Sequence, residues 1–417
     1  RSSDLVVIKI TLLLASQIPP ALLLIMNWEE NEIFRSFGFA FGYSALSCFI
    51  IAALLSLRFS AIERLFHGLD NIYEIHHLMG RLTVGFVILH ILFIFSSYSR
   101  ESVSYFLNPA ILSFDYLSGW ISLLLILIVI FFAVFLDRGH KLWRTIHLLS
   151  FPAYLSASYH FYSLSSTESI VKLGYIFALF LGLASMLLST FKYFSRRYKI
   201  EKIDHLNESV VSLSSKPLGR KINYKPSQFV FVSFESYKRY SACCEFHPFT
   251  ITSVEGDEFL EVVVKSRGDC SSKIQGIERG AIARLDGAYG GFVIKDASQV
   301  WIGAGIGITP FVSLVRQVNC KVDLYYVVKN DKDFVLLDRL RTTANKGVTI
   351  YPVLIDNDSQ KLLSIIKANS SDLPTKYFLI SGPPSMVNDL HKLLQNDGVP
   401  SYNIEHETCG FMGYNFT

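Results

Sequence analysis

Four histidines lie in two apolar stretches of the sequence, where polar side chains are uncommon. His76 and His90 belong to one stretch, and His147 and His160 belong to another. Ionisable side chains inside membrane-spanning segments are costly to bury and usually mark a functional site. Neutral imidazole is a common axial ligand of haem iron. Two pairs on two spans therefore favour two haems at two depths, each held by one histidine from either span.

The spacing within each stretch bears on this hypothesis. His76 and His90 are 14 residues apart, which is about 21 Å along a helix and places both imidazoles on one face. The 13-residue step from His147 to His160 leaves those two rings roughly 140° apart on an ideal helix. Pro152 lies between them and can distort the helix.

Two alternatives accompany the haem hypothesis. His77 lies 13 residues before His90 and is the alternative to His76 as the inner ligand. The four histidines could also serve polar packing or a proton path. Polar rings without partners inside hydrocarbon would cost several kcal/mol, and matched depths on two spans favour haem over both alternatives.

The elements that must position these histidines are membrane spans. The 417-residue chain is 51% hydrophobic and only 18% charged, whereas soluble proteins carry about 25% charged residues. Residues 1–192 are apolar, and residues 200–417 have an ordinary soluble composition. Each apolar run is close to the roughly 20 residues needed to cross the hydrocarbon core. The predicted spans are 5–26, 38–58, 75–97, 117–136, 143–163 and 169–191.

Charge placement predicts the orientation of these six spans. Basic residues gather in the connections 59–74 and 137–142 and in the exit segment 192–199. The positive-inside rule then places the N-terminus and the C-terminal half in the cytosol. The small net charge of +4 makes nucleic acid an unexpected partner. Six cysteines without a CxxC pair indicate a reducing compartment and argue against zinc or an iron–sulfur cluster.

The segment 200–297 is predicted to form a small antiparallel β-barrel. Alternating β-type runs are separated by turn residues. Within it, His247-Pro248-Phe249-Thr250-Ile251-Thr252 offers a proline-fixed backbone with hydroxyl and aromatic side chains, which suits the flat ring of a flavin. A later glycine-rich turn at 286–292 lets the backbone approach a ligand closely, or else forms a simple hairpin.

The segment 298–417 is predicted to be a parallel sheet covered by helices. After the first strand, Gly303 to Pro310 places glycines before a helix N-terminus, where backbone N–H groups can bind phosphate. Ile308 occupies the last position, so this is not a GxGxxG fingerprint. Ser381-Gly382-Pro383 follows a later strand at the same sheet edge, where ligands bind. Strands are predicted near 298–302, 321–328, 348–354, 376–380 and 402–407, and helices near 310–318, 334–344, 359–368 and 384–396.

In combination, these motifs resemble the NADPH oxidase / ferric reductase superfamily, and its bacterial NADPH oxidases more closely. The resemblance implies three domains: six transmembrane helices with haem (1–195), an FAD-binding β-barrel (200–297) and an NAD(P)H-binding α/β domain (298–417). It implies two b-type haems, with His76 and His147 as ligands on the inner side and His90 and His160 on the outer side.

The resemblance also implies where FAD and NADPH bind. The FAD residues are His247, Pro248, Phe249, Thr250 and Thr252, with Lys265 and Gly268 near its phosphates. The NADPH residues are Gly303, Gly305, Gly307, Thr309, Pro310, Gly382 and Pro383. Relatives often place a near-terminal aromatic over the flavin. Phe411 is the candidate for that catalytic position, and Phe416 is second.

The implied activity is electron transfer from NAD(P)H through FAD and both haems to O2, forming superoxide outside the cytosol. The alternative acceptor is a ferric chelate. The implied setting is the plasma membrane, as a multi-pass chain without an obligatory protein subunit. The choice between NADPH and NADH stays open, although Lys329 after the second strand could meet a 2′-phosphate. Cys270-Ser271 replaces a Trp-Thr pair common in relatives, and Ser381 replaces a cysteine.

Overall fold

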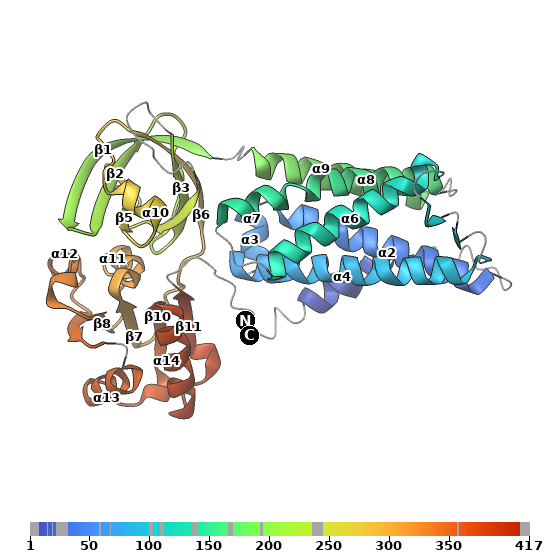
Figure 1. Ribbon diagram of the computed structural model, residues 1–417. Coiled ribbons are helices and arrows are strands. Elements are labelled where there is room, and N and C mark those ends of the chain that lie inside the picture. The colour runs from blue at the N-terminus through green and yellow to red at the C-terminus, as the bar shows by residue number, and fades with distance from the viewer. Residues whose placement is uncertain are drawn as a thin grey trace. The chain divides into compact units, whose positions relative to one another are not determined.

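The computed structural model consists of two compact units, Arg1–Tyr193 and Phe194–Thr417, each of which is described by itself (Figure 1). The residues described are 8–14, 16–18, 20–21, 32–57, 60–66, 68–99, 103–104, 106–108, 112–135, 140–165, 170–191, 195–235, 245–356 and 358–408.

Over its described residues, the N-terminal unit contains helices joined by turns and no strand. Its helices are α2 (Ile33–Leu55), α3 (Ser60–Leu65), α4 (Leu69–Ser96), α6 (Phe114–Phe135), α7 (His140–His147), α8 (Ser150–Leu164) and α9 (Ile170–Thr190). Four stretches are long and apolar enough to cross a membrane: Ile33–Leu55, Asn71–Ser96, Phe114–Ala133 and Val171–Thr190. They correspond to the second, third, fourth and sixth predicted spans. Of the first predicted span, 5–26, the structure describes residues 8–14, 16–18 and 20–21, and a shorter apolar helix covers Ile8–Ile18.

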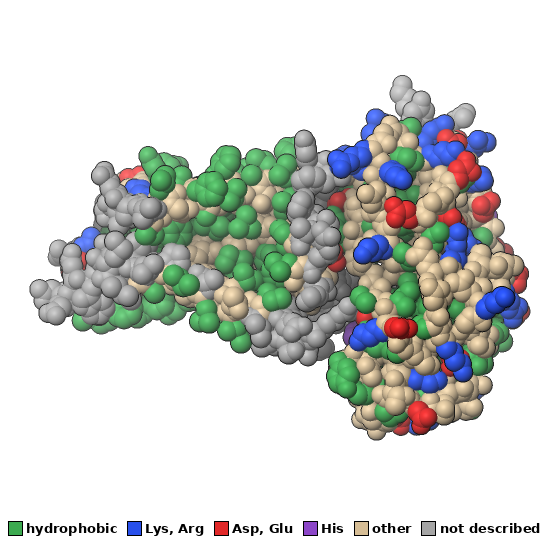
Figure 2. Space-filling view, turned by 180° about the vertical axis from the view of Figure 1, so that it is seen from behind, with side chains coloured by type: hydrophobic (Ala, Val, Ile, Leu, Met, Phe, Trp, Pro, Cys, Tyr) green, Lys and Arg blue, Asp and Glu red, His purple; other side chains and the backbone are tan. Residues whose placement is uncertain are grey.

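The surface of these helices suits a lipid environment. Large apolar side chains such as Leu92, Leu124, Phe131 and Phe180 are more than half exposed. Figure 2 shows apolar side chains spread over the described surface of this unit, whereas charged side chains are scattered over the C-terminal unit. Soluble proteins rarely expose contiguous apolar surface on this scale, so the surface supports the membrane assignment.

The predicted fifth span, 143–163, is helical but not one continuous helix. A turn separates α7 (His140–His147) from α8 (Ser150–Leu164). The backbone N–H of Leu149 donates to the carbonyl three residues earlier at 2.9 Å, and that of Phe151 does so at 3.1 Å. Pro152 has no N–H to continue the ladder, so tight 3₁₀-type bonds replace it. The 140° offset of an ideal helix therefore does not apply to the two histidines.

The first lobe of the C-terminal unit is a curled antiparallel sheet. Its strands follow the order β4-β3-β6-β1-β2-β5. A bridge between Ile251, which follows β4, and Val262 in β5 brings the two ends of this order together. The inward side chains form one apolar core, which matches the predicted barrel. The elements are β1 (Arg196–Asn207), β2 (Val210–Pro217), β3 (Phe229–Phe234), β4 (His247–Thr250), β5 (Leu260–Lys265), α10 (Asp269–Ile274) and β6 (Ile282–Tyr289).

The second lobe has three layers. A parallel sheet in the order β11-β10-β7-β8-β9 lies between α13 and α14 on one face and α11 and α12 on the other. Val300 and Ile302 pack on the first face, and Trp301 between them packs on the second, as period-2 alternation requires. The bounds are β7 (Gln299–Ala304), α11 (Thr309–Leu314), β8 (Val322–Val328), α12 (Leu337–Thr343), β9 (Val348–Leu354), α13 (Ser359–Asn369), β10 (Tyr377–Gly382), α14 (Pro384–Asn396) and β11 (Ile404–Thr408). These confirm the predicted strands and helices.

Candidate functional site

The structure brings the four predicted histidines together as two pairs. The ring centroids of His76 on α4 and His147 on α7 are 6.1 Å apart. Those of His90 on α4 and His160 on α8 are 6.4 Å apart. His77 lies beside His76, with ring centroids 5.9 Å apart, and the ring paired with His147 in the first pair is that of His76.

Backbone carbonyls fix the tautomer of three of these imidazoles. Nδ1 of His76 lies 3.0 Å from the Ala52 carbonyl, and Nδ1 of His90 lies 2.8 Å from the Gly38 carbonyl. Nδ1 of His160 lies 2.8 Å from the carbonyl of Asp115. A carbonyl only accepts, so each Nδ1 carries the proton and each Nε2 keeps its lone pair. Metal-ligating histidines usually donate their second ring N–H in this way.

The pair separations match two imidazoles on opposite sides of one metal ion. A metal–imidazole bond is about 2 Å long, and each nitrogen lies about 1 Å from its ring centre, so such rings have centres about 6 Å apart. The observed 6.1 and 6.4 Å fit that arrangement. The buried Nδ1 of His147 has no hydrogen-bond partner among the described residues, while its ring stacks on Trp143 at 5.0 Å. The donor set therefore fits bis-imidazole haem.

Two glycines outside the predicted ligand set make room for the outer pair. A Cβ on Gly42 of α2 would lie 2.9 Å from Nδ1 of His90. A Cβ on Gly119 of α6 would lie 2.8 Å from Cε1 of His160. Each glycine stands four residues after the carbonyl that accepts from the same imidazole. Each outer imidazole is thus held by a backbone carbonyl and has room because the residue one helical turn later is a glycine. The sequence shows the four-residue interval between each carbonyl and its glycine. It does not show which histidine-bearing helix packs against that interval.

Helix α2 also matches the spacing of the histidines on α4. Ala52 and Gly38, which accept from His76 and His90, are 14 residues apart, as the two histidines are. The helices run in opposite directions, so each carbonyl meets its imidazole at the same level. Both levels are therefore set by the pairing of α2 with α4.

The predicted flavin segments lie side by side. One ligand atom each from Glu245, His247 and Cys270 falls within 4.8 Å of the others, so β4 meets the entry of α10. Pro248 is exposed on edge strand β4, where a missing N–H is tolerated. Ser271 Oγ accepts from the backbone N–H of Gly268 at 3.0 Å. The two motifs thus form one surface.

Two details differ from the predicted roles of this region. Thr252 is fully buried, and its hydroxyl donates to the Glu261 carbonyl at 3.3 Å, which gives it a contact within the sheet. Cys270 is disulfide-bonded, contrary to the reduced thiols expected from cysteine spacing. Its sulfur is therefore no thiolate ligand for a metal at Glu245 and His247.

The glycine-rich turns of the second lobe pack against each other. A Cβ on Gly307 would lie 2.7 Å from the Ser381 carbonyl carbon, and a Cβ on Gly382 would lie 2.8 Å from Cβ of Ala304. Gly305 adopts φ +55°, a left-handed conformation that favours glycine. Both predicted nucleotide turns therefore meet at the carboxyl edge of β7 and β10.

Several other predicted positions have a clear placement. Thr309 is buried and its hydroxyl donates to the Ile306 carbonyl at 2.9 Å. Pro310 is the second residue of α11. Lys265 ends β5. The turn at 286–292 contacts β11, since the N–H of Gly291 donates to Glu407 Oε1 at 3.3 Å. Phe411 and Phe416 lie outside the described residues.

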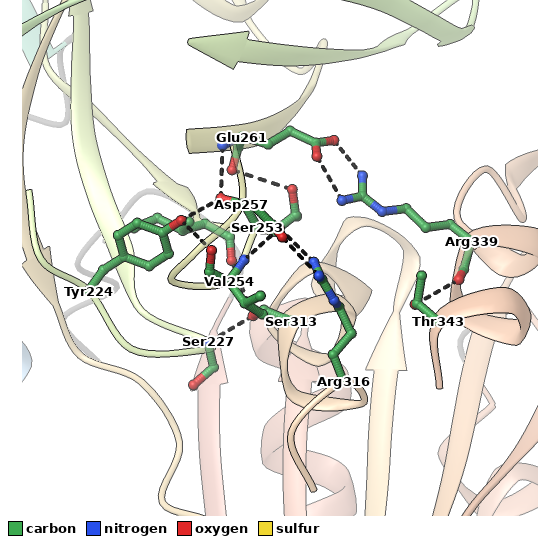
Figure 3. A network of polar contacts seen from close by, with 12 residues as sticks. Tyr224, Ser227, Ser253, Val254, Asp257, Glu261, Ser313, Arg316, Arg339 and Thr343 are labelled. Carbon is green, nitrogen blue, oxygen red and sulfur yellow. Dashed lines mark hydrogen bonds and ion pairs between the residues drawn. The ribbon is translucent and has the colours of Figure 1, made fainter. Parts of the chain in front are cut away.

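Polar contacts join the two lobes of the C-terminal unit (Figure 3). Arg316, just after α11, binds Asp257 of the barrel through both guanidinium ends at 2.6 and 2.8 Å. Arg339 on α12 binds both carboxylate oxygens of Glu261 on β5. The Arg316 hydrogen bond holds the pKa of the Asp257 carboxyl below its usual range. These bidentate pairs fix the nucleotide lobe against the flavin lobe.

Three family profiles match successive parts of the chain. They are "Ferric reductase like transmembrane component" over residues 41–158, "FAD-binding domain" over 195–281 and "Oxidoreductase NAD-binding domain" over 301–392.

Individual relatives agree with these profiles. A superoxide-generating NADPH oxidase heavy chain of Dictyostelium discoideum is 26% identical over 232 residues, which are 50% of this chain and 33% of that protein. Respiratory burst oxidase homolog protein D of Solanum tuberosum is 31% identical over 166 residues, 33% of this chain and 18% of that protein. The chain thus spans a third or less of these relatives. A ferredoxin NADP+ reductase structure from Neisseria gonorrhoeae with bound FAD and NADP is 21% identical, with TM-score 0.44 over 52% of this chain and 98% of that one.

Membrane helices with paired histidines thus precede a flavin-binding and a nicotinamide-nucleotide-binding domain in one chain. The three matched profiles in this order, together with these relatives, support the NADPH oxidase / ferric reductase superfamily for this chain. The finer resemblance to its bacterial members stays a prediction.

Proposed function

We propose that the chain is a transmembrane NAD(P)H oxidase. Electrons would pass from NAD(P)H through FAD, an inner haem b and an outer haem b to O2, which becomes superoxide outside the cytosol. The observation that carries this proposal is the pair of imidazole pairs, with ring centroids 6.1 and 6.4 Å apart, in a chain that continues into an FAD and NAD domain.

In this proposal, residues 1–195 hold both haems. His76 and His147 are the inner ligands, and His90 and His160 are the outer ligands. Haem iron supplies one-electron redox chemistry when it is bound. The carbonyls of Ala52, Gly38 and Asp115 keep the proton on Nδ1, so that Nε2 presents its lone pair.

Residues 200–297 would bind FAD, which converts a two-electron hydride donor into a source of single electrons. Phe249 and Thr250 on β4 would border the flavin ring, and the backbone around Gly268 would face its phosphates. Phe411 would cover the ring. The support for one continuous flavin site is the contact of β4 with the entry of α10.

Residues 298–417 would bind NAD(P)H at the carboxyl edge of the sheet. Gly303, Gly305 and Gly307 would admit its phosphates beside Gly382 and Pro383. The close packing of the two turns leaves no room for side chains at Gly307 and Gly382. The interlobe ion pairs at Asp257 and Glu261 would hold the nicotinamide end over the flavin lobe.

The orientation is also part of the proposal. The flavin and nucleotide module would lie in the cytosol. The support is the set of basic residues in the connections 59–74 and 137–142 and in the exit segment 192–199, because such residues favour the cytosolic side. Electrons then leave the cell across the membrane, against an inside-negative potential, at about 2.3 kcal/mol per electron per 100 mV. NAD(P)H oxidation supplies that work, and no further protein subunit takes part.

The test uses the purified full-length chain in detergent. Under argon, NADPH should reduce the haem when FAD is present and should leave it oxidised when FAD is absent. The haem absorption bands report which state is present. After air is admitted, cytochrome c reduction should be sensitive to superoxide dismutase. The variant His90→Leu should lose superoxide-dependent cytochrome c reduction, whereas His205→Leu, at an exposed strand histidine of the barrel, should keep it.

Two results would count against the proposal. A preparation without a Soret band would remove haem from the scheme and leave a proton path or polar packing for the histidines. Reduction of ferrozine-detected iron without superoxide would assign the same electron path to a ferric-chelate reductase.

A further inference from the structure

An exposed ion pair stands at the carboxyl edge of the nucleotide-lobe sheet. Lys329 directly follows β8, and Asp356 follows β9, its parallel neighbour. Lys329 Nζ lies 2.6 Å from Asp356 Oδ1. The two side chains are 54% and 74% exposed, so both can change partner at little cost.

The Lys329–Asp356 pair lies where the adenosine ribose of a bound dinucleotide is expected. Phosphates are expected at the turn after β7, the central strand. In sheets of this kind, the end of the next strand carries the group that reads the adenosine ribose: a carboxylate for a 2′-hydroxyl or a cation for a 2′-phosphate. β8 pairs with β7 from Val322 to Val327, so the end of β8 holds the corresponding place here.

Two arginines of this lobe already have carboxylate partners on the flavin lobe. Arg316 binds Asp257, and Arg339 binds Glu261. Asp358, close to Asp356, caps α13 by accepting from a backbone N–H at 2.9 Å. The Lys329–Asp356 pair thus joins a cation at the end of β8 to a carboxylate just after β9.

We propose that the Lys329–Asp356 pair sets the selectivity of this chain between NADPH and NADH. Lys329 attracts the 2′-phosphate of NADPH, and Asp356 opposes it by repelling the phosphate and holding the lysine. The same carboxylate can accept from the free 2′-hydroxyl of NADH. This inference rests on the proposed function, since it assumes that the nucleotide lobe binds NAD(P)H.

The experiment compares Asp356→Asn and Lys329→Gln with the unaltered full-length chain. The first reading is the ratio of kcat/KM for NADPH to that for NADH. The second is calorimetric binding of 2′-phospho-AMP and of AMP, which needs no electron transfer. Lys332→Gln is the matched control, because it removes a lysine three positions along the same loop.

Asp356→Asn should raise the NADPH to NADH ratio, and Lys329→Gln should lower it, each by roughly fivefold, the size of an exposed charge–charge contact. Binding of 2′-phospho-AMP should follow the same order, while Lys332→Gln should leave both readings unchanged.

Unchanged ratios in both variants, or a shift produced by Lys332→Gln instead, would overturn the inference. Failure of the proposed function would look different, because the unaltered chain would then oxidise neither nucleotide. The two failures are therefore distinguishable in one set of measurements.

Discussion

The substitution Gly119→Ala tests whether a missing side chain on α6 positions the outer haem ligand. The added Cβ would lie 2.8 Å from Cε1 and 2.9 Å from Nδ1 of His160. Ordinary van der Waals contact begins at 3.4 Å, so the imidazole must move by about 0.6 Å. The carbonyl of Asp115 lies on the same helix as Gly119 and accepts from Nδ1 of His160 at 2.8 Å. Moving the imidazole away from α6 would therefore also lengthen this hydrogen bond.

This displacement exceeds what metal coordination tolerates. Metal–ligand distances in proteins stay within about 0.2 Å of their usual values, which is a third of the required shift. Overpacking a well-filled site costs about 1–3 kcal/mol, whereas alanine in place of glycine within a helix gains only about 0.5–1 kcal/mol. The clash should therefore outweigh the gain in helix propensity.

We expect Gly119→Ala to lower the haem content from two per chain towards one. The assay is pyridine haemochromogen absorbance per mole of purified protein, with redox titration to identify the haem that remains. Gly85→Ala on α4 is the control, since a Cβ there meets nothing within 4 Å, and it should keep both haems. Full haem content and unchanged midpoint potentials in Gly119→Ala would refute the reasoning.

Three further predictions concern the inner ligand, the nucleotide turn and the lobe interface. His76→Leu should lose the inner haem while His77→Leu keeps it, since the 6.1 Å pair with His147 uses the ring of His76; haem content per chain decides this. Gly307→Ala should raise the KM for NADPH and lower the thermal midpoint, because its Cβ would fall 2.7 Å from a backbone carbonyl carbon; a normal KM would contradict it. Asp257→Asn should destabilise the chain by less than about 1 kcal/mol at neutral pH. Because the Arg316 hydrogen bond lowers the pKa of Asp257 in the folded chain, its contribution is complete above the ordinary aspartate pKa of about 4 and is lost as the pH falls through the lowered value. Denaturant titrations of the variant and the unaltered chain should therefore converge in acid.

The strands and helices of the nucleotide lobe could be read from the sequence because their signals are local. β9 and α14 begin and end at the predicted residues, since uninterrupted apolar runs and proline or glycine turns mark them. The histidine pairs were predictable for a similar reason: an imidazole in an apolar run is costly to bury unless it has a specific partner.

What the sequence could not supply were contacts that depend on a second element. Because a turn separates α7 from α8, the angle between the rings of His147 and His160 cannot be taken from an ideal helix. Pro152 indicated that the helix could be distorted there. The hydroxyl of Thr252 looked available for a ligand but satisfies a neighbouring strand. Asp257 and Arg316 are ordinary surface charges until the two lobes come together. The carbonyls and glycines that surround His90 and His160 could be identified only once the pairing of α2 with α4 and of α6 with α8 was known.

The matched 14-residue intervals on α2 and α4 have a consequence for how this membrane domain can change. The separation between the two histidine levels is fixed in both helices, by the interval from His76 to His90 on α4 and by that from Gly38 to Ala52 on α2. An insertion in one helix alone would leave an imidazole without its acceptor, so the levels can move apart or closer only through paired changes of both helices. Removing one turn from each would bring the levels nearer by about 5 Å, which turns a fixed distance into an adjustable one for engineered electron transfer.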